Sequence, residues 1–259
     1  MKQNFNYHTH TARCGHASGE DEQYILSAIK AGYKQLGMSD HRPYEGIPAP
    51  RDRMNWEQLQ GYLDSMHYLK EKYSDQIDIK IGLESEFIPE SIEETVRLRK
   101  RVDYFILGQH SKEPEILVDY CFDCSAEDLE YYISDIEQGL DSGMYLYLAH
   151  PEYFMIGQPT FNEKCVEAAH RLAAKCAATG IPMEINLKGI SFGKRDYGNG
   201  MLYPYPHRPF WEIVSQYPVK CIYGWDAHTP EFLQRQDLIE KAEKELRGLN
   251  LQFVKEPLF

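Results

Sequence analysis

Short apolar runs alternate with amphipathic stretches along the whole sequence, and each apolar run ends in a side chain that can bind a metal ion or a substrate. Strands that alternate with helices in this way are typical of βα units and a parallel sheet. Helix start signals lie between the runs: Ser91 to Glu94 and Thr160 to Glu163 have the pattern of capping boxes, and Thr229-Pro230 that of an N-cap followed by proline. The predicted strands are residues 4–10, 35–41, 78–87, 103–110, 144–150, 182–186 and 220–228.

The polar groups at these strand ends predict how the units are arranged. They follow one another at roughly 36-residue intervals, the length of about one strand, one helix and two loops. Parallel strands that all end in functional groups are typical of a βα barrel, whose active site lies where the carboxyl ends converge. A doubly wound open sheet is the alternative, but its ligands gather at one switch point. We therefore predict an α/β barrel of seven or eight units.

Composition limits the protein classes that remain. With 259 residues, 42% of them hydrophobic, and no linker or low-complexity tract, one domain over residues 1–259 is expected. The balance of 28 Lys and Arg against 40 Asp and Glu gives a net charge of −12. This sign disfavours nucleic acid and anionic membranes as partners.

Neither a membrane-spanning stretch nor a signal-peptide core is visible in the sequence, so we expect a cytoplasmic protein. In that compartment cysteines are most simply reduced thiols. A lone C-x-x-C pair without a second pair is weak evidence for a zinc knuckle. The six cysteines are Cys14, Cys121, Cys124, Cys165, Cys176 and Cys221.

Two pairs of potential metal ligands at strand ends, one of two histidines and one of an aspartate and a histidine, are the best evidence for a metal site. His8 and His10 stand at i and i+2, which directs both imidazoles to one face of a strand. Asp226 and His228 repeat that spacing at the last predicted strand. For either pair, the alternative is that the residues are polar groups at a strand end and bind no metal. Imidazole and carboxylate together suit zinc, iron or manganese.

Glu84 lies in an otherwise apolar strand, where a buried carboxylate is costly unless cations neutralise it. Glu86 has the same parity and is the alternative ligand. His110 and His150 each close an apolar run, so each could instead be a core histidine. His16 follows the first strand in a loop that could fold over the barrel mouth.

Seven short motifs, in this order and spacing, resemble the polymerase and histidinol phosphatase (PHP) family over nearly the whole chain. Within it, Glu184-Ile185-Asn186, Tyr203-Pro204 and Phe210-Trp211 are similar to the PHP-type histidinol-phosphate phosphatases. The resemblance implies a distorted (β/α)7 TIM-like barrel in a single domain. The motifs are His8-Thr9-His10, Cys14-Gly15-His16-Ala17, Ser39-Asp40-His41, Gly82-Leu83-Glu84, Gly108-Gln109-His110, Ala149-His150-Pro151 and Asp226-Ala227-His228.

The resemblance also implies three divalent transition-metal ions, of zinc, iron or manganese. One would be held by His8, His10, Glu84 and Asp226, and a second by Glu84, His110 and His150, with Glu84 bridging. A third would be held by His16, His41 and His228.

Such a centre predicts the reaction. Three divalent cations with two carboxylates and a bridging hydroxide leave a charge of roughly +3, which favours a dianion. A metal-bridging hydroxide attacking a phosphate monoester fits this charge. The expected substrate is the small molecule L-histidinol phosphate, of histidine biosynthesis, and the leaving alcohol would receive its proton through Asp226 or His228. No oligomeric state is predicted.

The phosphate-binding residues depart from the family pattern. The family's arginine is expected soon after the Glu184 to Asn186 strand, but Ser191 occupies that place. Because a guanidinium binds phosphate in bidentate fashion, Arg195 is the first candidate and Arg42 the second. Lys194 and His207 complete the candidate set.

Three other functions share parts of the pattern. An amidohydrolase-type barrel also opens with His-x-His, but it needs a bridging lysine where this chain has Glu84. A non-catalytic PHP module serving a polymerase would not need every ligand type. A PHP nuclease, acting on a nucleic-acid end, is disfavoured by the charge of −12.

Overall fold

The computed structural model describes residues 3–49, 52–116, 119–122, 124–198 and 200–259. In this part of the chain, eight strands form one curled parallel sheet in the order β1-β2-β3-β4-β5-β6-β9-β10. The strands are β1 (Phe5–Asn6), β2 (Gln35–His41), β3 (Asp78–Ser85), β4 (Tyr104–Leu107), β5 (Tyr145–Leu148), β6 (Met183–Asn186), β9 (Lys220–Gly224) and β10 (Gln252–Phe253). A separate antiparallel hairpin pairs β7 (Arg195–Asp196) with β8 (Met201–Leu202).

Backbone hydrogen bonds just beyond β1 and β9 join the two ends of the curled sheet. The amide of His10 donates to the carbonyl of Ala227 over 2.9 Å, and the amide of Ala227 donates to His8 over 3.2 Å. Strand β10 pairs with the first residues of β9, at the opposite end of that seam. The predicted α/β fold, a distorted TIM-like barrel, is therefore confirmed, with β10 as an addition.

The first strand is much shorter than predicted because a side chain replaces the strand ladder there. The Asn6 amide donates to the carbonyl of His8 and to the hydroxyl of Thr9, and its oxygen accepts from the amide of Trp225. This bends the chain out of regular strand geometry just before the two histidines. Strands β3, β4, β5 and β9 also end before the predicted limits. Glu84 remains within β3, whereas the polar residues after β4, β5 and β9 lie in loops.

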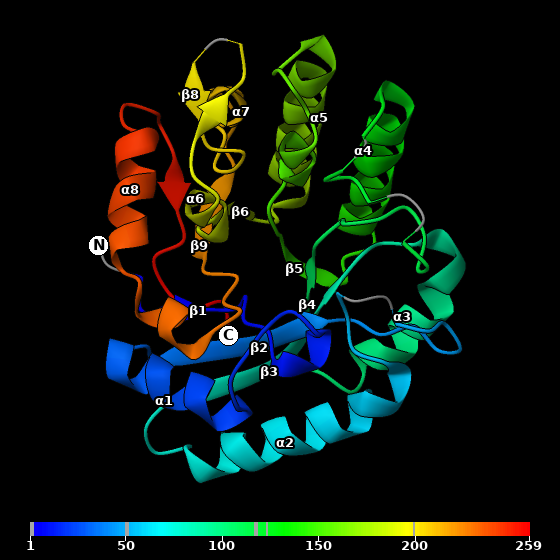
Figure 1. Ribbon diagram of the computed structural model, residues 1–259, viewed down its shortest axis with the longest axis vertical. Helices are drawn as coiled ribbons and strands as arrows, with labels where there is room; N and C mark the ends of the chain where they lie inside the picture. Colours follow the sequence, from blue (N-terminus) through cyan, green and yellow to red (C-terminus); the bar gives the residue numbers. More distant parts are fainter. Residues whose placement is uncertain (1–2, 50–51, 117–118, 123, 199) are drawn as a thin grey trace.

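Helices cover the outside of the sheet, with α1 and α2 along β2 and β3 and the later helices beside the remaining strands (Figure 1). The α-helices are α1 (Asp21–Ala31), α2 (Leu59–Lys72), α3 (Ile92–Arg99), α4 (Ala126–Asp141), α5 (Glu163–Thr179), α6 (Lys188–Ser191), α7 (Arg208–Val214) and α8 (Asp237–Glu245). Short 3-10 helices are η1 (Ala12–Cys14), η2 (Trp56–Gln58), η3 (Pro89–Ser91), η4 (Tyr153–Ile156) and η5 (Pro230–Gln234).

Neither of the two predicted capping boxes forms. Ser91 is the N-cap residue of α3, as predicted, but its hydroxyl donates to the carbonyl of Ile88 and makes no capping hydrogen bond. Helix α5 is capped by Asn162, whose side chain accepts from two backbone amides, so Thr160 lies outside the helix. The third signal holds in position, because Thr229 precedes η5 with proline at its start.

Inside the barrel, an aromatic floor lies below the polar strand ends. Tyr7, Tyr104 and Tyr147 are buried there together with aliphatic side chains. The Tyr104 hydroxyl donates to the carbonyl of Tyr7, the residue before His8, over 2.8 Å. On the side of this floor away from the histidines, Phe259 packs edge-on against Tyr7 and Tyr104.

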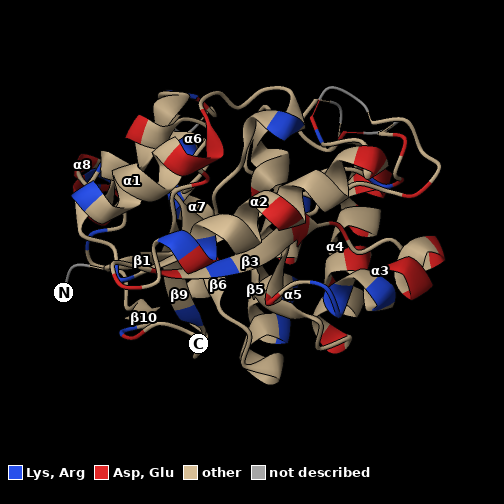
Figure 2. Cartoon of the chain, turned by 90° about the horizontal axis from the view of Figure 1, so that it is seen from below, with Lys and Arg blue, Asp and Glu red and all other residues tan. Residues whose placement is uncertain are grey.

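The surface carries charges of both signs. In the view of Figure 2, α1, α2 and α3 carry both basic and acidic positions, whereas the charged positions of α4 are all acidic. Among the described residues, no helix has the length and apolar character needed to cross a membrane.

Asp135, on the inner face of α4, predicts a pH-dependent stability. The residue is 8% exposed, and burial, with a contribution from Glu90, raises the pKa of its carboxyl to about 7. Below the unfolded pKa near 4, this raised carboxyl pKa does not change the free energy of unfolding. As the pH rises from 4 to 7 the free energy of unfolding falls, and above 7 the loss is complete. Asp135→Asn should therefore raise the melting temperature by roughly 2–4 °C or more at pH 8, for a gain of about 1 kcal/mol or more, and by little at pH 4. An equal shift at both pH values, in thermal melts of the two proteins, would contradict this.

Candidate metal centre

Glu84, at the end of β3, lies at the centre of the barrel mouth and is 1% exposed. Its two oxygens are surrounded by five imidazoles, all predicted as metal ligands. Such a buried carboxylate needs several positive charges around it. The nearest distances from its oxygens are 2.7 Å to His150 Nε2, 3.2 Å to His41 Nδ1, 3.3 Å to His8 Nε2, 3.4 Å to His10 Nε2 and 3.4 Å to His110 Nε2.

Two glycines make room for this arrangement. A Cβ at Gly108, on the loop after β4, would stand 2.1 Å from Glu84 Oε1. A Cβ at Gly224, in β9, would stand 1.6 Å from Glu184 Oε1. A side chain at either position would project into the barrel, so glycine leaves the space that the two carboxylates occupy.

Asp226 and His228 approach the same centre from the loop after β9. Asp226 Oδ1 lies 3.2 Å from His10 Nε2, 3.2 Å from His228 Nδ1 and 3.6 Å from His8 Nε2. Asp226 and His150 both have positive φ values, 50° and 25°. Such backbone strain in non-glycine residues is concentrated at functional sites.

The donor set fits divalent metal ions. His8 Nε2, His10 Nε2 and Glu84 Oε2 are buried, and no hydrogen bond reaches them from any part of the chain that the structure describes. Buried polar atoms without partners are rare unless a ligand satisfies them. Imidazole nitrogens and carboxylate oxygens in this number are the ligands of transition-metal ions.

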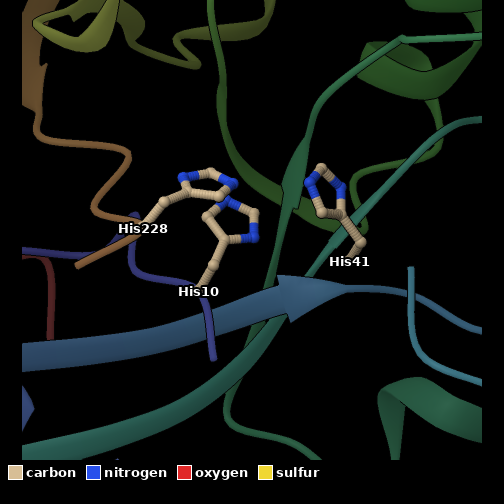
Figure 3. Close-up of side chains that lie close together, drawn as sticks. All are labelled: His10, His41 and His228. Atoms are coloured by element: carbon tan, nitrogen blue, oxygen red, sulfur yellow. The ribbon is translucent and has the colours of Figure 1, made fainter. Parts of the chain in front are cut away.

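The ligand atoms fall into groups that could each hold one ion. Within each group they lie within 4.8 Å of one another: His8, His10 and Asp226 form one group, and His8, Glu84 and His150 another. A third comprises His10, His41 and His228, whose rings converge from three segments of the barrel mouth in Figure 3.

His16 differs from the expected grouping. Its ligand atoms group with those of His228 and of Cys14, a buried residue predicted only as a reduced thiol. The ring of His16 lies 4.4 Å from that of His228 and 5.5 Å from that of His41, between centroids. His16 is therefore at the edge of the cluster. No disulfide joins any of the six cysteines in the part of the chain that the structure describes.

The electrostatics prepare these groups for cations. Burial alone would raise the pKa of Glu84, but the surrounding imidazoles lower it well below its usual range. Burial would also raise the pKa of Asp226, and Lys188 together with nearby histidines lowers it strongly. Burial lowers the pKa of His41 and His228 well below 6.5, which favours the neutral imidazole that binds a metal ion, whereas, against the effect of burial, nearby carboxylates raise the pKa of His8 and His10.

Three carboxylates behind the imidazoles were not assigned this role by the sequence. Glu184 Oε1 lies 2.8 Å from His8 Nδ1, Glu86 Oε1 lies 3.2 Å from His110 Nδ1, and Asp40 Oδ1 lies 3.5 Å from His10 Nδ1. Carboxylates in this position orient metal-binding histidines and raise their basicity. Glu86, the alternative ligand, is thus behind the cluster, where two guanidinium contacts from Arg53 hold it at 3.1 and 3.2 Å. The only signal in the sequence was its matching strand parity with Glu84.

Replacing Glu184 should test this outer layer. Glu184→Gln removes the charge that orients His8, and we expect metal affinity to fall by about 10- to 100-fold. Glu152→Gln is the matched control. Glu152 is as deeply buried, but it accepts from Trp211 and the amide of His207 and contacts no imidazole of the cluster. Burial raises the pKa of Glu152 to about 8, so glutamine replaces a mostly neutral acid there. Equal metal affinity in both variants, measured by competition with a chelator, would refute the role of Glu184.

The candidate phosphate-binding residues lie in four different environments. Arg195 lines the mouth, but its guanidinium donates to the carbonyls of Met155 and Gln158 over 2.5 and 2.9 Å. Lys194 points outward to Glu245, at 2.6 Å. Of these two residues, only Arg195 lines the mouth.

Arg42 and His207 do not fit the predicted role. Arg42 is fully buried, donates to Glu94 and Thr95, and stacks on Tyr44. Its side chain turns away from the mouth to the carboxylate of Glu94. His207 is also fully buried, between aromatic rings, and does not line the mouth.

A cavity of about 380 Å³ opens over the cluster. Lys188, which the sequence reasoning overlooked, lines it beside Asp226. Its position two residues after Asn186 was the available signal in the sequence. Aromatic side chains form much of the remaining wall, including Phe122, Tyr205 and the exposed Phe192.

Comparisons with known proteins agree with this geometry. The PHP domain family model matches residues 6–188, well over half of the chain. A Deinococcus radiodurans protein named "Probable histidinol-phosphatase" is 27% identical over 239 residues, which cover 86% of this chain and 85% of that protein. The histidinol-phosphatase of Bacillus subtilis is 30% identical over 89 residues, covering 32% and 33% of the two chains.

A solved structure shares the fold. Histidinol phosphate phosphatase from Lactococcus lactis, crystallised with zinc, L-histidinol and phosphate, superposes with a TM-score of 0.72 at 16% identity, covering 97% of this chain and 95% of the other. With the order of motifs, the barrel and the family match in agreement, this chain belongs to the PHP domain family.

Proposed function

We propose that this protein is a metal-dependent phosphomonoesterase that hydrolyses L-histidinol phosphate to L-histidinol and phosphate. The observation that carries the proposal is Glu84, buried among five imidazoles at the bottom of an open cavity. The substrate is supported by the relatives named as histidinol-phosphatases, one of which matches along most of both chains.

Nine residues would hold the metal ions, which we propose to be three in number. When bound, divalent ions at this position supply an activated water and neutralise charge on the phosphate oxygens. The residues are His8, His10, His16, His41, Glu84, His110, His150, Asp226 and His228, with Glu84 shared between ions.

The chain itself provides a path for the proton that the leaving alcohol needs. Asp226 lines the cavity, and its Oδ1 lies 3.2 Å from His228 Nδ1. Asn186 donates to the other oxygen of Asp226 over 3.2 Å, which fixes the carboxylate plane. We assign proton transfer to Asp226 Oδ1, with His228 as its immediate partner.

The rest of the cavity suits the organic half of histidinol phosphate. Phe122 and Phe192, which are 79% and 54% exposed, stand at its rim, and Tyr205 forms part of the wall. Aromatic faces attract an imidazole ring and an ammonium group. Asp52 also lines the cavity and provides a carboxylate for that ammonium.

A panel of phosphate monoesters tests the substrate. Metal-loaded protein should hydrolyse L-histidinol phosphate with a higher kcat/KM than other small phosphate esters, a 5′-nucleotide or a phosphorylated oligonucleotide end. Preference for another monoester would retain the phosphatase and reject the named substrate. Turnover of an amide or cyclic amide, with no phosphate ester accepted, would favour an amidohydrolase instead.

A further inference from the structure

We propose that Lys188 is the cation that binds the phosphate group of the substrate in this protein. The inference deepens the proposed function and rests on it, because it identifies the anion as the phosphate of the substrate. Ser191 stands where the family's arginine is expected, so this chain needs a positive group from another position.

Lys188 is placed at the mouth by the end of β6. Its backbone amide donates to Asn186 Oδ1 over 2.9 Å, while the amide of the same asparagine donates to Asp226. One side chain thus holds both the start of α6 and the carboxylate of the cluster. The Lys188 ammonium lines the cavity and lies 3.1 Å from His228 Nδ1 and 3.5 Å from Asp226 Oδ1.

The ammonium of Lys188 has few ionic contacts within the protein, which suits a group that binds a ligand. Among the described residues, its one carboxylate contact is Asp226, and at 3.5 Å that contact is long. Asp226 and His228 are also groups that a metal ion would take. An ammonium beside bound cations is repelled by them unless an anion lies between, and the dianionic phosphate supplies that anion.

The other basic residues are less available. Arg195 is held by two carbonyls and stacks on Tyr197, and Lys194 is paired with Glu245 outside the cavity. Lys188 is the basic side chain closest to the ligand atoms in the described structure, since it contacts two of the proposed ligands directly. A lysine also binds phosphate as a point charge without needing bidentate geometry.

Phosphate binding to the zinc-loaded protein tests the inference directly. Inorganic phosphate should bind to Lys188→Ala about 10- to 100-fold more weakly than to the wild type, by calorimetry and as a product inhibitor, because a charge-assisted contact is lost. Inhibition by L-histidinol, which has no phosphate group, and zinc content should both be unchanged. Lys188→Arg should recover most of the phosphate affinity.

Lys175→Ala is the matched control, because that lysine pairs with Asp141 on the outer helices and should leave phosphate binding unaltered. Unchanged phosphate affinity in Lys188→Ala would overturn the inference, and so would a loss of zinc in parallel with the loss of phosphate binding. Should the alanine variant fold poorly, Lys188→Gln keeps the stem and gives the same comparison. If phosphate binding depends on Lys188 but histidinol phosphate is not hydrolysed, the phosphate site stands and the proposed substrate fails.

Discussion

Glu84→Gln is expected to lose bound metal and activity together. The amide keeps the size of the side chain but removes the negative charge that five imidazoles and the metal ions share. Because the metal ions supply the activated water, loss of their shared ligand should lower kcat/KM by roughly 10²–10⁴, which is equivalent to about 3–5 kcal/mol of transition-state stabilisation. Elemental analysis and steady-state kinetics on the same sample measure both effects.

Two comparisons make this result specific. Glu93→Gln, on the exposed side of α3, should retain the metal content and activity of the wild type. His16→Ala removes a ligand at the edge of the cluster, so it should lose less metal than Glu84→Gln. A Glu84→Gln protein with full metal content would mean that Glu84 is not the shared ligand.

The positions of the seven predicted strands, and the polar residues that follow them toward the barrel mouth, could be predicted from sequence because periodicity and chemistry agree there. Strand β2 has the predicted limits, and His41 at its end joins the cluster. Strand β10 and the hairpin of β7 and β8 were missed, because two-residue strands are too short to show alternation. They form only where a neighbouring strand or loop is already in place.

The outer layer of the site could not be assigned from sequence. Glu184 and Asp40 lie on different strands from the histidines they orient, and the pairing arises only when the barrel closes. Arg42 shows the opposite failure. It adjoins His41 in sequence, but successive residues of a strand point to opposite faces, so its side chain leaves the mouth and reaches Glu94.

Removal of the metal should abolish activity and lower thermal stability together. Without cations, the buried nitrogens of His8 and His10 and the oxygen of Glu84 have no interaction that replaces their hydrogen bonds to water in the unfolded chain. Ions present at 100 to 1,000 times their dissociation constant stabilise the fold by about 2.7 to 4.1 kcal/mol. At roughly 2–4 °C per kcal/mol, chelation should lower the melting temperature by about 5–16 °C.

Reloading should restore both properties, with a metal content approaching the proposed three ions per chain. Histidine ligands bind metal only as neutral imidazoles, so protons compete with cations as the pH falls. The melting temperature of the loaded protein should therefore approach that of the chelated protein below about pH 6, near the usual histidine pKa. Stoichiometry that stays at one ion after supplementation, or activity that survives complete chelation, would contradict a shared multi-metal centre around Glu84.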